Sequence, residues 1–187
     1  MSLIRSFISL NIESSLQKRL KLIQDVVKEE LKNHKIKWEK DEKFHLTLRF
    51  LGDTEREKLD KLSRDLRQIT LGFDAIKMTT NGIGFFPNQK FPNVVFIDLL
   101  DDGNKSELLA DKIEDVLNKF EYKPEKKFIP HITLGRFKRE NRKRLGENIN
   151  FKTEPVEIIF ESFNLMKSTL MPGGSVYELL YEYKFKI

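Results

Sequence analysis

Residues 45–48 read His-Leu-Thr-Leu, and residues 131–134 read His-Ile-Thr-Leu. The chain has only three histidines, and two of them open these tetrapeptides. Side chains alternate between the two faces of a β-strand, so His and Thr share one face and the two aliphatic residues share the other. Each copy predicts a strand that buries one side and presents an imidazole and a hydroxyl on the opposite side. Two copies in one chain predict that the two imidazoles meet across one cleft.

The elements around the tetrapeptides predict two similar halves, because the order strand, helix, His-Thr strand, helix occurs twice. Alternating and continuous apolar runs predict the strands, and apolar stripes at helical spacing predict the helices. Residues 82–87 predict a break in regular structure after a strand over residues 73–81, since Gly and Pro punctuate them. The basic segment 138–144 predicts a short further helix. The fold expected for residues 1–187 is a single α+β domain, bilobal, with two pseudo-symmetric lobes of mainly antiparallel sheet, outer helices and a central cleft.

Composition excludes several classes of protein. The chain has 187 residues, 39% of them hydrophobic and 34% charged, which is typical of a soluble globular protein. It has no cysteine, which excludes disulfides, thiolate metal sites and a cysteine nucleophile. No apolar run approaches the roughly 20 residues that span a bilayer, and we expect a cytoplasmic monomer. The net charge of +5 fits a polyanion such as nucleic acid, and equally a lysine-rich solvated surface.

Two imidazoles in one cleft predict acid–base chemistry. Free imidazole titrates near pH 6.5, so His45 and His131 can supply one neutral and one protonated ring near neutrality. The general base and the general acid would each contribute about 10²–10⁴-fold in rate. The hydroxyls of Thr47 and Thr133 can donate hydrogen bonds to an anion held between the rings. Phosphodiester cleavage without a metal fits this arrangement.

Two arginines near the tetrapeptides are candidates for binding phosphate. Arg49 stands four residues after His45, so strict alternation places it on the same face as that histidine. Arg136 stands five residues after His131 and would point away, unless a bulge at Gly135 re-aims it. Guanidinium is the favoured group for bidentate phosphate contacts.

Other interpretations of the histidines remain open at this point. A single strand histidine is usually a hydrogen-bonded structural residue, although that reading does not explain the repeat. Two histidines under-fill a zinc shell, and no acidic residue stands at a ligand-like spacing beside either, so we expect no metal and no cofactor. The chain lacks a nucleophile elbow and a phosphate-binding glycine fingerprint. A non-catalytic module that binds nucleic acid through a basic cleft is the rival function.

The tetrapeptides and their flanks resemble the two-histidine (2H) phosphoesterase superfamily, whose mark is a duplicated His-x-Thr/Ser-x. Within it the chain is most similar to the RNA 2′,3′-cyclic phosphodiesterase branch, historically called 2′-5′ RNA ligase. Where that branch often has a Trp after its middle segment, this chain has Phe96. The matching stretches are Trp38, residues 45–52, residues 82–87 with 92–94, residues 130–136, and residues 168–177.

The resemblance implies metal-independent hydrolysis of RNA 2′,3′-cyclic phosphate ends to 2′-phosphates. It implies that His45 protonates the leaving 3′-oxygen and His131 activates water. It also implies that Thr47 and Thr133 bind the non-bridging oxygens, with help from Arg136. The phosphate-binding role of Arg49 comes from strand geometry alone. The expected partner is RNA with a 2′,3′-cyclic phosphate end, with no membrane involved. The alternatives are a non-catalytic RNA-binding module and 2′-5′ RNA ligation by the reverse reaction.

Overall fold

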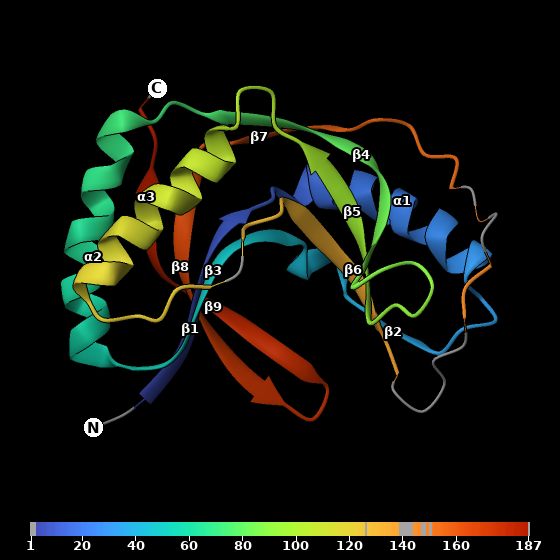
Figure 1. Ribbon diagram of the computed structural model, residues 1–187, viewed down its shortest axis with the longest axis horizontal. Helices are drawn as coiled ribbons and strands as arrows, with labels where there is room; N and C mark the ends of the chain where they lie inside the picture. Colours follow the sequence, from blue (N-terminus) through green and yellow to red (C-terminus); the bar gives the residue numbers. More distant parts are fainter. Residues whose placement is uncertain (1–2, 126, 139–143, 147–148, 150, 187) are drawn as a thin grey trace.

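The computed structural model describes residues 3–125, 127–138, 144–146, 149 and 151–186, and Figure 1 shows their arrangement. Most of the basic segment predicted as a short helix lies outside the described residues. No helix in the described ranges is both long and apolar enough to cross a membrane. The helices are α1 (Ser14–Glu30), α2 (Arg56–Ile69) and α3 (Lys105–Lys119). The strands are β1 (Leu3–Asn11), β2 (Ile36–Trp38), β3 (His45–Glu55), β4 (Ile76–Phe86), β5 (Val94–Leu100), β6 (His131–Phe137), β7 (Glu157–Phe160), β8 (Ser162–Met171) and β9 (Gly174–Lys184).

The strands of the described residues form one curled sheet in the order β7-β4-β5-β6-β3-β1-β8-β9, with β2 also paired to β6. Each pairing between these strands is antiparallel. The two His-Thr strands, β3 and β6, are neighbours at the centre, joined where Leu46 pairs with Ile132. The predicted α+β class and mainly antiparallel sheet are confirmed. The strands on either side of the β3–β6 pairing are the two halves of this one sheet, and the bilobal description stays a prediction.

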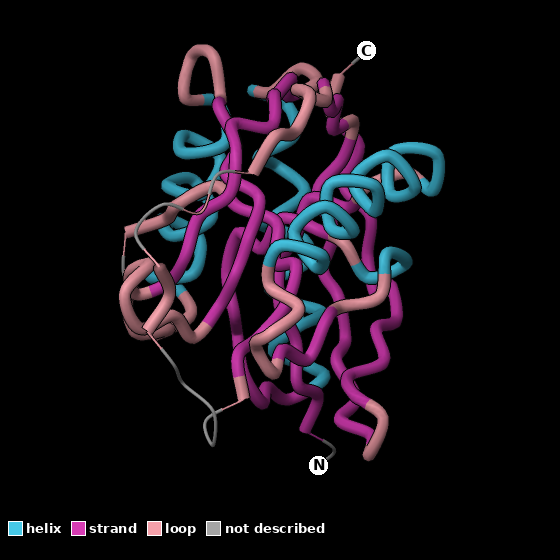
Figure 2. Tube along the Cα trace, turned by 90° about the vertical axis from the view of Figure 1, so that its right-hand side faces the viewer, coloured by secondary structure: helices cyan, strands magenta, loops and turns pink. Residues whose placement is uncertain are grey.

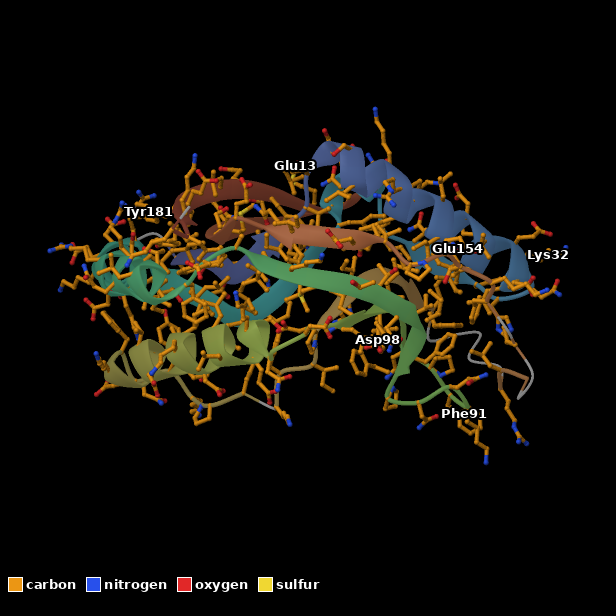
Figure 3. All side chains as sticks on the ribbon, turned by 90° about the horizontal axis from the view of Figure 1, so that it is seen from above. Glu13, Lys32, Phe91, Asp98, Glu154 and Tyr181 are labelled. Carbon is orange, nitrogen blue, oxygen red and sulfur yellow. The ribbon has the colours of Figure 1, made fainter. Side chains whose placement is uncertain are left out.

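The helices lie outside the strands and cover opposite sides of the sheet (Figures 2 and 3). The α1 helix lies behind β6, where the buried Gln24 donates hydrogen bonds to the carbonyls of Glu39 and Leu134 at 2.8 and 3.0 Å. The α2 and α3 helices pack together on the other side. Each helix buries the apolar stripe that its sequence predicts, because that stripe loses its contact with water only against the sheet. The buried stripe residues are Leu20, Ile23 and Val27, then Leu59, Leu62 and Leu66, then Leu109, Ile113 and Val116.

The predicted break after residue 81 is wrong, because β4 continues to Phe86. The pairing of β4 with β5 shifts between Thr80 and Ile83, so two residues of β4 stand opposite one residue of β5. Gly82 lies inside this bulge with φ 85°, a left-handed conformation that glycine adopts without a steric penalty. The glycine therefore absorbs an extra residue and lets the strand go on.

Candidate active site

Both His-Thr strands carry a β-bulge directly after the threonine. Ser9 pairs with Thr47 but Ile8 pairs with Arg49, so one extra residue stands in β3. The pairing of β6 with β5 shifts at the corresponding place, between Thr133 and Gly135. A bulge reverses the faces of the residues that follow it. In both strands the fourth residue after the histidine therefore turns to the core, and the fifth turns to the histidine's side.

The bulge in β6 turns Arg136 toward the side of the histidines. From the sequence, this orientation is expected only with a bulge at Gly135. The strand β2 runs tightly against the bulge, because a methyl group on Gly135 would lie 2.7 Å from Ile36 Cγ2 and 3.0 Å from Trp38 Cε3. Only glycine fits at that point without movement of β2. The exposed Arg136 lines the same cleft as the two histidines.

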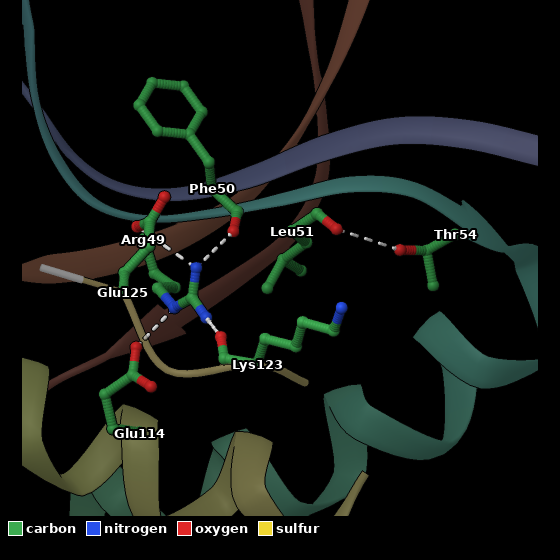
Figure 4. A network of polar contacts seen from close by, with 7 residues as sticks. All are labelled: Arg49, Phe50, Leu51, Thr54, Glu114, Lys123 and Glu125. Carbon is green, nitrogen blue, oxygen red and sulfur yellow. Dashed lines mark hydrogen bonds and ion pairs between the residues drawn. The ribbon is translucent and has the colours of Figure 1, made fainter. Parts of the chain in front are cut away.

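The predicted placement of Arg49 is wrong. The bulge in β3 turns its side chain away from His45, and it is 6% exposed. Its guanidinium pairs with Glu114 of α3 and, at 3.1 Å, with Glu125, and it donates hydrogen bonds to the carbonyls of Phe50, at 2.8 Å, and Lys123 (Figure 4). These contacts are all within the protein, so Arg49 ties β3 to α3 and to the loop before β6.

The structure brings the other five predicted residues together. His45, Thr47, His131, Thr133 and Arg136 line one cleft of about 870 Å³, a volume in the range of small-molecule sites. The cleft opens on the side of β3 and β6 opposite to their buried aliphatic residues, as strand alternation predicts.

The two imidazoles are oriented in the same way. Nδ1 of His45 donates a hydrogen bond to the carbonyl of Lys43 at 2.7 Å, and Nδ1 of His131 donates to the carbonyl of Ile129 at 2.7 Å. Because a carbonyl can only accept, each neutral ring carries its proton on Nδ1 and leaves Nε2 free to take one. Nε2 of His45 accepts a hydrogen bond from the Thr47 hydroxyl at 3.0 Å. Each ring is thus prepared to exchange a proton through Nε2.

Aromatic rings hold His45 on one side of the cleft. Its ring centroid lies 5.1 Å from that of Phe7 in β1 and 5.4 Å from that of Tyr177 in β9. Burial lowers the pKa of His45 from its ordinary value, and the positive charges of His131 and Arg136 lower it further. The hydrogen bond to the Lys43 carbonyl opposes this effect in part.

A second pair of aromatic rings holds His131. Phe86 and Phe96 contact its ring edge-on at 5.0 and 5.2 Å and stack on each other. Phe96 is 6% exposed, so it supports the histidine from below and presents little surface to a ligand. Burial lowers the pKa of His131 as well, and Arg136 adds to this, whereas the hydrogen bond to Ile129 and the charge of Asp98 oppose it.

Sequence reasoning missed several residues of this cleft. Phe7, Phe50, Lys43 and Tyr177 line it together with the histidines. Phe50 stands five residues after His45, the position that Arg136 takes after His131, so the repeat itself held the signal for Phe50. Tyr177 comes from an alternating strand with no chemical motif, and only the sheet order places it beside His45.

Comparison with known proteins identifies the family of this chain. The family described as LigT like Phosphoesterase matches residues 10–96 and 100–177. The chain belongs to this family. An RNA 2′,3′-cyclic phosphodiesterase of Thermotoga maritima is 29% identical over 97% of this chain and 96% of its own. One of Methanocaldococcus jannaschii is 31% identical over 96% and 99%.

Within the LigT-like family the fold is shared as well. The crystal structure of the Thermus thermophilus protein TT0787 superposes with a TM-score of 0.78 and 25% identity, covering 97% of this chain and 98% of that one. Across the described part of the chain, no three His, Asp or Glu side chains gather as a group that could hold a metal ion.

Proposed function

We propose that this protein hydrolyses the 2′,3′-cyclic phosphate at RNA ends to a 2′-phosphomonoester, with two histidines and no metal ion. The observation that carries the proposal is the pair of His-Thr strands that line one cleft, each with Nδ1 tied to a backbone carbonyl. The names of the relatives support the substrate.

The reaction needs one neutral and one protonated imidazole. The neutral ring takes a proton from water at Nε2 while the water oxygen forms a bond to phosphorus. The bond from phosphorus to O3′ breaks, and the imidazolium gives its proton to that oxygen. Thr47, Thr133 and Arg136 would hold the non-bridging oxygens, where negative charge builds up in the transition state. The exposed ring of Phe50 offers a surface on which a base could stack.

The twofold arrangement allows either order of the two roles. The family resemblance gives His45 as the acid and His131 as the base. Burial lowers the pKa of both rings, and the charge of Asp98, on the strand beside His131, opposes this effect at His131 alone. A slow-reacting His45→Ala variant that is rescued by a substrate with a better 3′ leaving group, when His131→Ala is not, would assign the acid role to His45.

Phosphorus NMR with a 2′,3′-cyclic-phosphate oligonucleotide in EDTA tests the proposal. We expect a 2′-phosphate product, and a loss of at least about 10²-fold in rate for His45→Ala or His131→Ala. His34→Ala is the matched control, because His34 lies outside the residues that line the cleft, and it should keep wild-type activity.

Three outcomes would contradict the proposal. Turnover only with added metal removes the metal-free mechanism, and wild-type rates in either cleft variant remove the two-histidine mechanism. Salt-dependent RNA binding that survives both substitutions, without any product, would instead indicate a non-catalytic RNA-binding module. Joining of two RNA ends would show that the cleft holds the second end close enough for ligation.

A further inference from the structure

The turn of the β8–β9 hairpin lies at one end of the cleft, against two lysines. Lys43 Nζ donates a hydrogen bond to the carbonyl of Ser175 at 2.6 Å. A methyl group placed on Gly174 would lie 3.6 Å from Lys37 Nζ and 3.8 Å from Lys43 Nζ. Two ammonium groups from different elements therefore reach the same point beside the turn.

A third positive charge stands close by. Lys37 of β2 pairs with Arg136 of β6, and residues paired in this way present their side chains on the same face of a sheet. The carboxylate of Glu39 lines the cleft with Lys43 and Arg136. Within the described part of the chain, it forms no ion pair with either of them or with Lys37. The positive charges of Lys37, Lys43 and Arg136 repel one another, and a bound anion between them would reduce this repulsion.

The position of the lysines relative to the histidines limits what this anion can be. The Lys43 carbonyl accepts the hydrogen bond from His45 Nδ1, and the Lys43 ammonium donates to the carbonyl of Ser175. Ser175 stands two residues before Tyr177 in the extended strand β9, and the ring of Tyr177 contacts His45. Two residues of extended chain cover about 6–7 Å. The lysines therefore lie one short step from the imidazoles, on the scale of the step between neighbouring phosphates in an extended single strand.

We propose that Lys37 and Lys43, beside Gly174 at the start of β9, form a second phosphate subsite, which binds the phosphodiester on the 5′ side of the terminal nucleotide. This inference rests on the proposed function and names its substrate class. The substrate is an oligoribonucleotide that ends in a cyclic phosphate, in preference to a cyclic mononucleotide, which has no second phosphate. Arg136, nearer the histidines, serves the reacting phosphate.

Two matched substrates test the subsite. Adenosine 2′,3′-cyclic phosphate carries one phosphate, and the dinucleotide ApA with a 2′,3′-cyclic end carries two. We expect kcat/KM to be at least about 10-fold higher for the dinucleotide, since hydrogen bonds to charged groups commonly contribute that much. The dinucleotide rate should also fall more steeply with salt, with a log–log slope more negative by about 0.7 for each added phosphate contact.

Substitutions assign the preference to the two lysines. Lys37→Ala and Lys43→Ala should each lower the ratio of the two kcat/KM values by several-fold, and the double variant should bring it close to one. Lys184→Ala is the control of equal charge, because Lys184 lies in β9 at the end of the hairpin away from the turn. It should leave the ratio unchanged.

Binding of the products gives a readout that does not depend on turnover. Calorimetry with adenosine 2′-phosphate and with ApA 2′-phosphate should show tighter binding of the dinucleotide, by about 10-fold. Equal affinities, or a preference that survives the double variant, would overturn the subsite while the proposed function stands. Absence of turnover with both substrates would instead remove the proposed function, and the affinity ratio would still decide the subsite.

Discussion

An acidic residue pairs with only one of the two histidines. Asp98 of β5 pairs with His131, whereas Asn11 of β1 pairs with His45. Asp98 lies on the side of the sheet away from α1 (Figure 3), and its carboxylate also accepts a hydrogen bond from Asn81 at 3.0 Å. Paired residues in antiparallel strands have Cβ atoms about 4.5–5.5 Å apart, so this charge acts directly on the imidazole.

Asp98→Asn is therefore expected to lower the pKa of His131. The positive groups that face His131 are Arg136 of its own strand and His45 of β3, and both remain in the variant. Asn11→Asp is the matched converse and should raise the pKa of His45. NMR titration of the histidine ring carbons measures both, and a His131 pKa that does not respond to Asp98→Asn would rule out this asymmetry.

At the scale of elements, the buried Arg49 connects three of them. Its contacts join β3, α3 and the loop before β6, and Glu114 is 30% exposed. Arg49→Met is expected to lower the free energy of unfolding by about 3 kcal/mol, near the lower end for a broken buried pair because the carboxylates keep contact with water. Urea unfolding measures it. Arg56→Met, which breaks an exposed pair with Asp60, should cost less than about 1 kcal/mol. Equal losses in the two variants would contradict the buried role.

The sequence predicts the elements that depend on local patterns better than the features that depend on pairing with another strand. The apolar stripes of the helices and the alternation around residues 45–47 and 131–133 are local, and the structure has them as predicted. Bulges depend on the partner strand. Gly135 indicates the bulge in β6, whereas the matching bulge in β3 is indicated only by the repeat and not by residues 45–50 themselves. Strict alternation therefore predicts the wrong face for Arg49. For the same reason, Gly82 predicts a strand end where the structure has a bulge inside β4.

At the scale of the molecule, the sheet joins the two halves beneath the cleft. Leu46 and Ile132, which alternate with the cleft-facing residues, are both fully buried and pair directly. The same two strands that carry the histidines therefore hold the halves together. The distance and the orientation between the two imidazoles therefore depend on the buried pairing of Leu46 with Ile132.

The whole fold should accordingly become less stable when the histidines take up protons. Burial depresses the pKa of both rings, so between their folded pKa values and about 6.5 the unfolded chain binds more protons than the folded one. In that window the free energy of unfolding rises with pH. Urea unfolding at about pH 7 and about pH 5.5 should show a larger loss for the wild type than for a His45→Gln, His131→Gln double variant, which lacks both titrating groups. Equal losses would mean that the imidazoles take up protons as readily in the folded cleft as in water.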